Sequence, residues 1–192
     1  RESTLLKQDL IRLRGEHNQL NVLAACAIAC AAGLPARAIQ AGVEDFHGVA
    51  HRLEYVRSLH GAAWYNDSIA TAPERTMAAI RSFREPIVLL LGGRDKDLPW
   101  DDLAALVRQR VDHVVLFGEA AGKIQAALAK AGGPRPLTLE RTPDLESAVA
   151  AAARVAEEGD VVLLSPGGTS FDQFRDFEER GEAFRTWVSA LS

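Results

Sequence analysis

The sequence predicts an α/β doubly wound domain whose central strands run parallel. Strand-like and helix-like segments alternate from residue 86 onward. Three of the strand segments, "PIVLLLGG", "HVVLFG" and "DVVLLS", are apolar without alternation, as expected where helices cover both faces of a sheet. The 192 residues are enough for one such domain and part of another.

The beginning of the chain is predicted to be helical. Residues 17–32 form an apolar run that follows the polar entry "GEHNQLN" and ends at a Gly-Leu-Pro sequence. A second short helix is expected over residues 35–42. Gly48 then breaks the pattern, and we place a domain boundary there. The two predicted parts are residues 1–47 and 48–192.

The remaining elements follow in order. His60 and Gly61 separate two short strand-like runs, which indicates a hairpin. Pro73 suits the first turn of a helix, and Thr142 and Gly159 are expected to cap a later helix at its two ends. Strands are expected at 53–59, 62–67, 86–93, 113–118, 135–140 and 160–165, and helices at 73–83, 99–110, 120–133, 142–159 and 170–190.

The composition disfavours several classes of partner. The formal net charge is −4 and Lys and Arg are scattered, so no basic face for nucleic acid or an anionic membrane is indicated. Cys26 and Cys30 lie in an Ala-rich run of 13 residues, which is too short to span a bilayer. Core packing is expected for both, because no further His or Cys follows at metal-ligand spacing. We therefore expect a cytoplasmic protein, and the missing initiator Met leads us to expect a fragment.

Three polar loops follow predicted strands: "NDSIATAPE", "GGRDKDLP" and "SPGGTSFDQ". We expect them to converge at one edge of the sheet, because ligands bind beyond the carboxyl ends of parallel strands. One polar residue of 66–71 is expected to cap the next helix, and because one cap does not require four polar residues, one or more of the others can face a ligand. In "GGRDK", Arg94 and Lys96 supply positive charge, with a solvated turn as the alternative. The spacing is not that of a P-loop.

The loop "SPGGTSFDQ" is open to three interpretations: a nucleophile, an anion site or a simple turn. The G-x-S-x-G spacing is absent and every His lies at or before residue 113, which disfavours a serine hydrolase. Thr169 and Ser170 stand where the last helix is expected to begin. Backbone N–H groups and the helix dipole would there stabilise a carboxylate or a phosphate.

Two further pairs of residues have helical spacing. Asn18 and Asn21 are three apart, so their amides share a helix face and suit either a nucleotide base or a cap. His47 and His51 are four apart, but the intervening Gly48 makes a helix, and hence a metal site, doubtful. We assign no metal ligand in this chain.

Taken in order, "GEHNQLN", "GVEDFHGVAHRLEYV", "YNDSIAT", "LLLGGRDK" and "LLSPGGTSFDQFRDFEERGEAF" resemble the C-terminal part of the Mur ligase family over nearly the whole chain. "HR-x-E" is shared with folylpolyglutamate synthases, whereas "NDS-x-AT" and "SFDQF" resemble the D-glutamate-adding branch. The resemblance implies that residues 1–47 are the tail of a central ATP-binding domain. It implies that residues 48–192 are a Rossmann-like ligase domain, with a mainly parallel sheet of about six strands and helices on both faces.

The resemblance also implies a reaction. An ATP-dependent ligase of peptidoglycan precursor synthesis would join D-glutamate to UDP-N-acetylmuramoyl-L-alanine through an acyl phosphate. ATP is the implied cofactor, and the Mg²⁺ ligands are expected in the missing central domain. We expect a monomer that is inactive as this fragment, because phosphoryl transfer needs the P-loop and the metal.

Site residues are implied by the same resemblance. For D-glutamate, they are Lys96 on one carboxylate, Thr71, Ser170 and Phe171 on the other, and Phe177 as an aromatic wall. Cations and hydroxyls suit anions.

For ATP, the implied residues are Asn18 and Asn21 on adenine, Arg52 on the phosphates and Asp67 on the ribose. Ile69 departs from the pattern, because many relatives have Lys there. The alternatives are another Mur-type or folylpolyglutamate-type ligase and a non-enzymatic module that binds a nucleotide or an anion.

Overall fold

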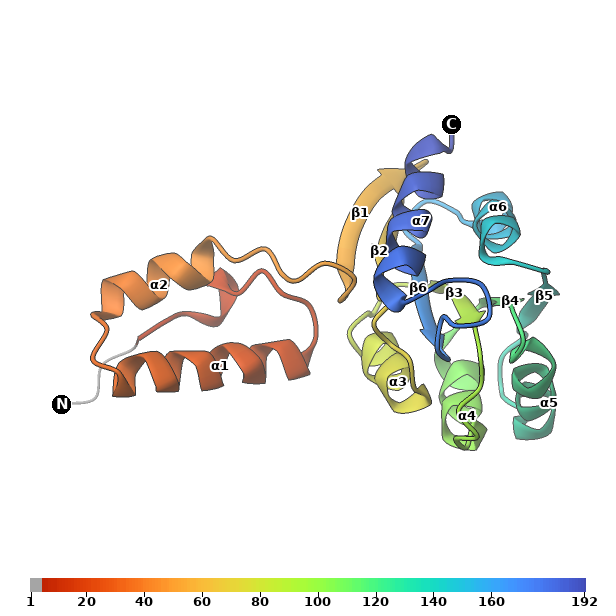
Figure 1. Cartoon of the computed structure of the whole chain (residues 1–192), viewed down its shortest axis with the longest axis horizontal. Helices are drawn as coiled ribbons and strands as arrows, with labels where there is room; N and C mark the ends of the chain where they lie inside the picture. Colours follow the sequence, from red (N-terminus) through yellow and green to blue (C-terminus); the bar gives the residue numbers. More distant parts are fainter. Residues whose placement is uncertain (1–4) are drawn as a thin grey trace. The chain divides into compact units, whose positions relative to one another are not determined.

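The computed structural model describes residues 5–192, which divide into two compact units. The first unit reaches Val49 and the second runs from Ala50 to Ser192. Figure 1 shows the helices and strands of each.

The first unit is helical and has a small core. Its elements are η1 Gln8–Leu10, α1 Glu16–Ala31 and α2 Ala36–Glu44, so both predicted helices are confirmed to within two residues. Val22 and Cys26 of α1 pack with Ile39 of α2. Cys30 is exposed. The expected core packing is therefore confirmed for Cys26 and wrong for Cys30, because the buried part of α1 ends at Cys26.

The second unit is a six-stranded sheet in the order β1-β2-β6-β3-β4-β5. Only β1 runs antiparallel to its neighbour, and the other pairs are parallel, which confirms the predicted α/β fold. The strands are β1 Glu54–Leu59, β2 Ala62–Asn66, β3 Ile87–Gly92, β4 His113–Phe117, β5 Thr138–Arg141 and β6 Val161–Gly167. The helices are α3 Pro73–Arg81, α4 Asp101–Arg110, α5 Ala121–Ala131, α6 Leu145–Val155 and α7 Phe177–Ala190.

Helices cover both faces of this sheet (Figure 1). Along β3, Ile87, Leu89 and Leu91 face the core formed with α3, α4 and α5, whereas Val88 and Leu90 face the core formed with α6 and α7. All five side chains are fully buried. The strand is apolar without alternation because neither face meets water.

The predicted hairpin is confirmed. His60 and Gly61 connect β1 to β2 with φ values of 49° and 82°, the left-handed geometry of a two-residue hairpin turn. The antiparallel pairing sets Glu54 opposite Asn66. The first residues of β1 therefore lie at the edge of the sheet where β2 ends.

The predicted caps of α6 are wrong at both ends. Asp144 is the N-cap, and its carboxylate accepts a hydrogen bond from the Ser147 N–H at 2.8 Å. Thr142 instead donates its hydroxyl to the Leu116 carbonyl at 3.1 Å. The helix ends at Val155, and Gly159 (φ 92°) forms the turn before β6.

The last helix begins later than predicted. It starts at Phe177, with Asp176 as its N-cap, so Thr169 and Ser170 lie before a stretch of turns rather than at a helix N-terminus. The helix-dipole argument for an anion site at these two residues is therefore wrong. The expected side-chain cap of α3 is also wrong, because its N-cap is Ala72.

Candidate functional site

The three polar loops converge, as the topology predicts. They follow β2, β6 and β3, which are neighbours in the sheet. Arg94 and Thr169 exchange two backbone hydrogen bonds, at 2.8 and 2.9 Å. The Gly167 N–H donates to the Ala70 carbonyl at 2.9 Å. Backbone hydrogen bonds thus join the loops after β2 and after β3 to the β6 segment that lies between them.

The residues predicted for D-glutamate come from these loops and from the start of α7. Lys96 donates from Nζ to the Thr71 hydroxyl at 3.3 Å, so this pair is brought together. Ser170 is buried, whereas Phe171 is 59% exposed. Phe177 is partly buried, and its ring meets that of His51 edge-on at 6.2 Å.

The loop that carries Lys96 is held by its neighbours. Asp95 accepts from Trp100 Nε1 at 3.0 Å and forms a short ion pair with Lys123 of α5. Burial raises the pKa of Asp95, but the hydrogen bonds from Lys123 and Trp100 outweigh it and leave the pKa below its ordinary value. Arg94 forms a two-bond pair with Glu119, at 2.9 and 3.1 Å.

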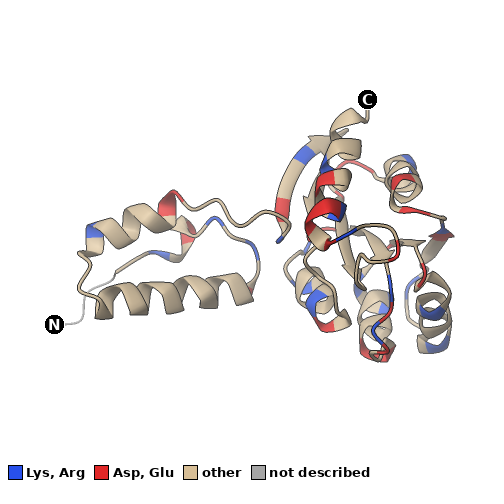
Figure 2. Cartoon of the chain, in the orientation of Figure 1, with Lys and Arg blue, Asp and Glu red and all other residues tan. Residues whose placement is uncertain are grey.

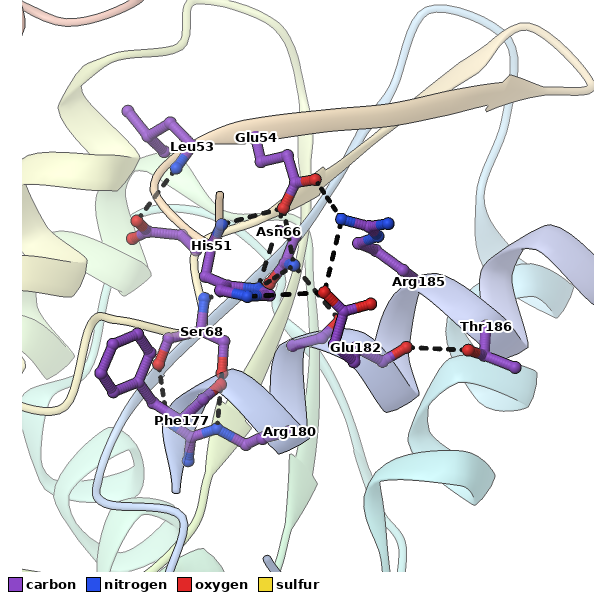
Figure 3. Close-up of polar contacts among 12 residues, drawn as sticks. His51, Leu53, Glu54, Asn66, Ser68, Phe177, Arg180, Glu182, Arg185 and Thr186 are labelled. Carbon is purple, nitrogen blue, oxygen red and sulfur yellow. Dashed lines mark hydrogen bonds and ion pairs between the residues drawn. The ribbon is translucent and has the colours of Figure 1, made fainter. Parts of the chain in front are cut away.

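Arg180 on α7 lies between two of the loops and is fully buried. Its Nε and Nη2 donate to the hydroxyl and the carbonyl of Ser68, at 2.9 and 2.8 Å, and its Nη1 donates to the Gly168 carbonyl at 3.1 Å. Figure 3 shows Arg180 beside Ser68. Burial lowers the pKa of Arg180 to about 10, although Asp172 opposes this, so the side chain stays charged at neutral pH.

No role for Arg180 is predicted from the sequence. Its loop partners lie 112 and 12 residues away in the sequence, so no local pattern links them. The signal that could have found it is an arginine followed directly by Gly181 on a helix with buried Phe184 and Val188. An arginine on such a face needs buried acceptors.

Asp67 is buried at the end of β2. Its Oδ1 accepts from the Leu53 N–H at 3.2 Å and its Oδ2 from the Ser165 hydroxyl at 2.9 Å. Burial raises the pKa of Asp67 to about 7, although these two hydrogen bonds, Arg52 and Arg75 favour the charged form. The carboxyl group is therefore partly protonated near neutral pH.

The residues predicted for ATP divide between the two units. Arg52 and Asp67 belong to the second unit, at the loop edge of the sheet. Asn18 and Asn21 belong to α1 of the first unit. Asn18 is buried and donates to the Arg14 carbonyl at 2.8 Å, which is a helix-entry contact, whereas Asn21 is exposed.

The described residues contain neither a candidate membrane span nor a candidate metal-binding cluster. Within residues 5–192, no helix is long and apolar enough to cross a membrane. The same part of the chain holds no group of three or more His, Cys, Asp or Glu side chains that could bind a metal ion. Figure 2 shows acidic and basic residues interspersed along the ribbon of the second unit.

Comparison with known families decides the relationship. A family model described as "Mur ligase, glutamate ligase domain" matches residues 51–168. The chain belongs to the Mur ligase family. The match covers all six strands of the sheet, from β1 to β6.

Two curated relatives of this Mur ligase chain carry the same name. A UDP-N-acetylmuramoylalanine–D-glutamate ligase from Symbiobacterium thermophilum is 48% identical over the whole chain and 42% of the relative's length. One from Roseiflexus is 48% identical over 96% of the chain and 40% of the relative. The chain thus spans about two-fifths of the length of these curated relatives.

Solved structures share the fold. The UDP-N-acetylmuramate-alanine ligase of Thermotoga maritima gives a TM-score of 0.66 at 18% identity, over 93% of this chain and 39% of that one. A Mycobacterium tuberculosis folylpolyglutamate synthase, solved with ADP and AMPPCP, gives 0.63 at 22% identity, over 91% and 41%.

We expect Arg180→Lys to destabilise this Mur ligase chain by about 2 kcal/mol, because an ammonium cannot reproduce the planar fork of hydrogen bonds to Ser68 and Gly168. Urea unfolding of the 192-residue chain measures the change. Arg175→Lys is the matched control, since the Arg175 side chain is 81% exposed, and it should change stability by less than about 0.5 kcal/mol. Equal stability of the two variants would contradict the role given to Arg180.

Asp67 predicts a pH dependence of stability. Its pKa is about 7 when folded and 3.8 ordinarily, so between these values the folded chain keeps a proton that the unfolded chain loses. The free energy of unfolding therefore falls as the pH rises through this window, by at most about 4 kcal/mol. Urea unfolding from pH 4 to pH 8 should show a smaller fall for Asp67→Asn, whose amide does not titrate. Parallel curves for the two proteins would refute this.

Proposed function

We propose that this chain is the C-terminal part of a ligase that uses ATP to join D-glutamate to UDP-N-acetylmuramoyl-L-alanine. The supporting observation is that curated relatives 38–48% identical to it, over at least 95% of its length, carry the name of that ligase. The similarity to other Mur ligases and folylpolyglutamate synthases is 16–22% in identity and indicates the fold alone.

Residues 1–47 are proposed to be the tail of a central ATP-binding domain, and residues 48–192 the ligase domain. The free thiols of Cys26 and Cys30 fit a reducing cytoplasm. We also propose that the protein is a monomer and that it has no nucleic-acid or membrane partner. Mg²⁺ ligands are proposed for the central ATP-binding domain, as the family resemblance implies.

The proposed reaction has two steps. The carboxylate of UDP-N-acetylmuramoyl-L-alanine takes the γ-phosphoryl group of ATP, which forms an acyl phosphate and releases ADP. The amine of D-glutamate then attacks the acyl carbon, the C–O bond to phosphate breaks, and an amide, inorganic phosphate and a proton result. This domain must therefore hold a dianionic amino acid with its amine free.

The loop geometry suits that task. The Lys96 ammonium and the Thr71 hydroxyl lie 3.3 Å apart, so they can share a carboxylate between them. Ser170 and Phe171 offer a hydroxyl and backbone N–H groups for the second carboxylate, and Phe177 closes one side. The loop backbones are fixed by Arg180 and by the Arg94–Thr169 pair, which limits the ordering that binding requires.

ATP contacts are proposed for four residues of the chain. Arg52 meets the phosphates, and Asp67 accepts from the ribose hydroxyls. Asn18 and Asn21 contribute amides for the adenine. Asp67 already accepts two hydrogen bonds, but a carboxylate has further lone pairs to offer a hydroxyl.

The full-length protein should release phosphate only when ATP, UDP-N-acetylmuramoyl-L-alanine and D-glutamate are present together. A coupled phosphate assay tests this, with each component left out in turn. Turnover with L-lysine or diaminopimelate in place of D-glutamate would contradict the proposed specificity. The 192-residue chain alone should be inactive.

Lys96→Ala should raise the KM for D-glutamate about 10- to 100-fold, because a hydrogen bond between charged groups contributes about 1.5–3 kcal/mol. The KM for ATP should stay unchanged. Lys130→Ala is the control, since Lys130 is an exposed lysine paired with Asp101. If Lys96→Ala and Lys130→Ala have the same D-glutamate kinetics, Lys96 does not contact this substrate.

A further inference from the structure

Arg52 lies between two residues with uncommon backbone geometry. His51 and Leu53 have φ values of 62° and 44°, in the left-handed region that residues other than glycine rarely adopt. For Leu53, which is not an Asn, Asp or Gly, this is especially unusual. Such conformations persist only where the surroundings impose them, and they are concentrated at functional sites.

Three hydrogen bonds fix the backbone on both sides of Arg52. The His51 N–H donates to Glu54 Oε2 at 2.9 Å, and the Leu53 N–H donates to Asp67 Oδ1 at 3.2 Å. The His51 carbonyl accepts from the Ile69 N–H at 3.1 Å. Two carboxylates, from Glu54 at the start of β1 and from Asp67 directly after β2, therefore hold the strained segment that carries this arginine.

The His51 side chain is fixed as well (Figure 3). The Asn66 Oδ1 accepts from the Ser68 N–H at 3.1 Å, which directs the Asn66 amide nitrogen to three other acceptors. These are His51 Nδ1 at 3.0 Å, Glu54 Oε2 at 3.1 Å and the Gly181 carbonyl at 3.3 Å. His51 Nδ1 is thus an acceptor in a buried network.

Helix α7 contributes two further partners to this network, Arg185 and the Gly181 carbonyl. Arg185 Nη1 donates to Glu54 Oε1 at 3.0 Å, so both oxygens of this carboxylate are used (Figure 3). Gly181 allows the approach, because a Cβ at that position would lie 2.1 Å from His51 Nδ1. The helix can contact His51 only with a glycine there.

We propose that Glu54 is a positioning residue, which, supported by Arg185, Asn66 and His51, fixes Arg52 where the phosphates of ATP bind. This inference rests on the proposed function, because the contact of Arg52 with the ATP phosphates is part of that proposal. Glu54 suits the role because a single carboxylate accepts from a backbone N–H, an amide and a guanidinium at once. Arg52 itself then reaches its ligand from a backbone that is already ordered.

The test uses kinetics of the full-length protein. Glu54→Gln keeps the side-chain shape but sets an amide nitrogen against the donors of Asn66 or Arg185. It should lower kcat/KM for ATP about 10-fold, the scale of a small misplacement of a binding group, and leave the KM for D-glutamate within about twofold. Arg185→Met should have a smaller effect in the same direction.

Arg57→Met is the matched control. Arg57 on β1 donates to the Ser189 and Leu191 carbonyls at the end of α7, at 3.1 and 3.3 Å, so it also fastens β1 to α7, but away from Arg52. It should leave kcat/KM for ATP within about twofold while changing the melting temperature about as much as Arg185→Met. Equal losses of ATP kcat/KM in the Arg57→Met and Arg185→Met proteins would overturn the proposal.

A double-mutant cycle with Arg52→Ala completes the test. If Glu54 acts through Arg52, Glu54→Gln should have no further effect on ATP in the Arg52→Ala protein. Additive losses would overturn the positioning role. Normal ATP kinetics of the Arg52→Ala protein would instead refute the proposed ATP contact of Arg52. Phosphate release by the wild-type protein without D-glutamate would refute the proposed function itself.

Discussion

The buried guanidinium of Arg180 is the interaction on which the arrangement of the loops depends. Among residues 5–192 it forms no ion pair, and its hydrogen bonds go to neutral oxygens of two loops that are far apart in the sequence. A buried charge is costly unless it is fully hydrogen-bonded. The folded state therefore has a strong preference for the arrangement in which the loops after β2 and β6 lie together against α7.

The antiparallel direction of β1 determines which further residues lie near the loops. In a wholly parallel sheet, the start of a strand lies at the edge opposite the ligand. Here the hairpin returns the segment before β1 to the edge where β2, β6 and β3 end, as the pairing of Glu54 with Asn66 shows. One reversed strand thus joins the His51–Glu54 segment to loops that follow parallel strands.

Much of this could be predicted from the sequence, because the signals are local. Apolar runs and the His-Gly turn predict the sheet, and the topology rule predicts where the loops meet. The start of α7 could not be predicted in this way. Ser170 and Asp176 are both good N-caps, and a propensity rule does not choose between them; in the structure it is Asp176 whose carboxylate accepts from the Glu179 N–H. The roles of Arg180 and of the Glu54 network depend on partners in distant segments, so spacing rules do not detect them.

The absence of a side chain at Gly181 also limits how the molecule can move. Because the backbone of α7 lies against the His51 ring at Gly181, there is no free space between helix and ring at this point. A displacement that brings Gly181 nearer to His51 would meet the imidazole ring at once.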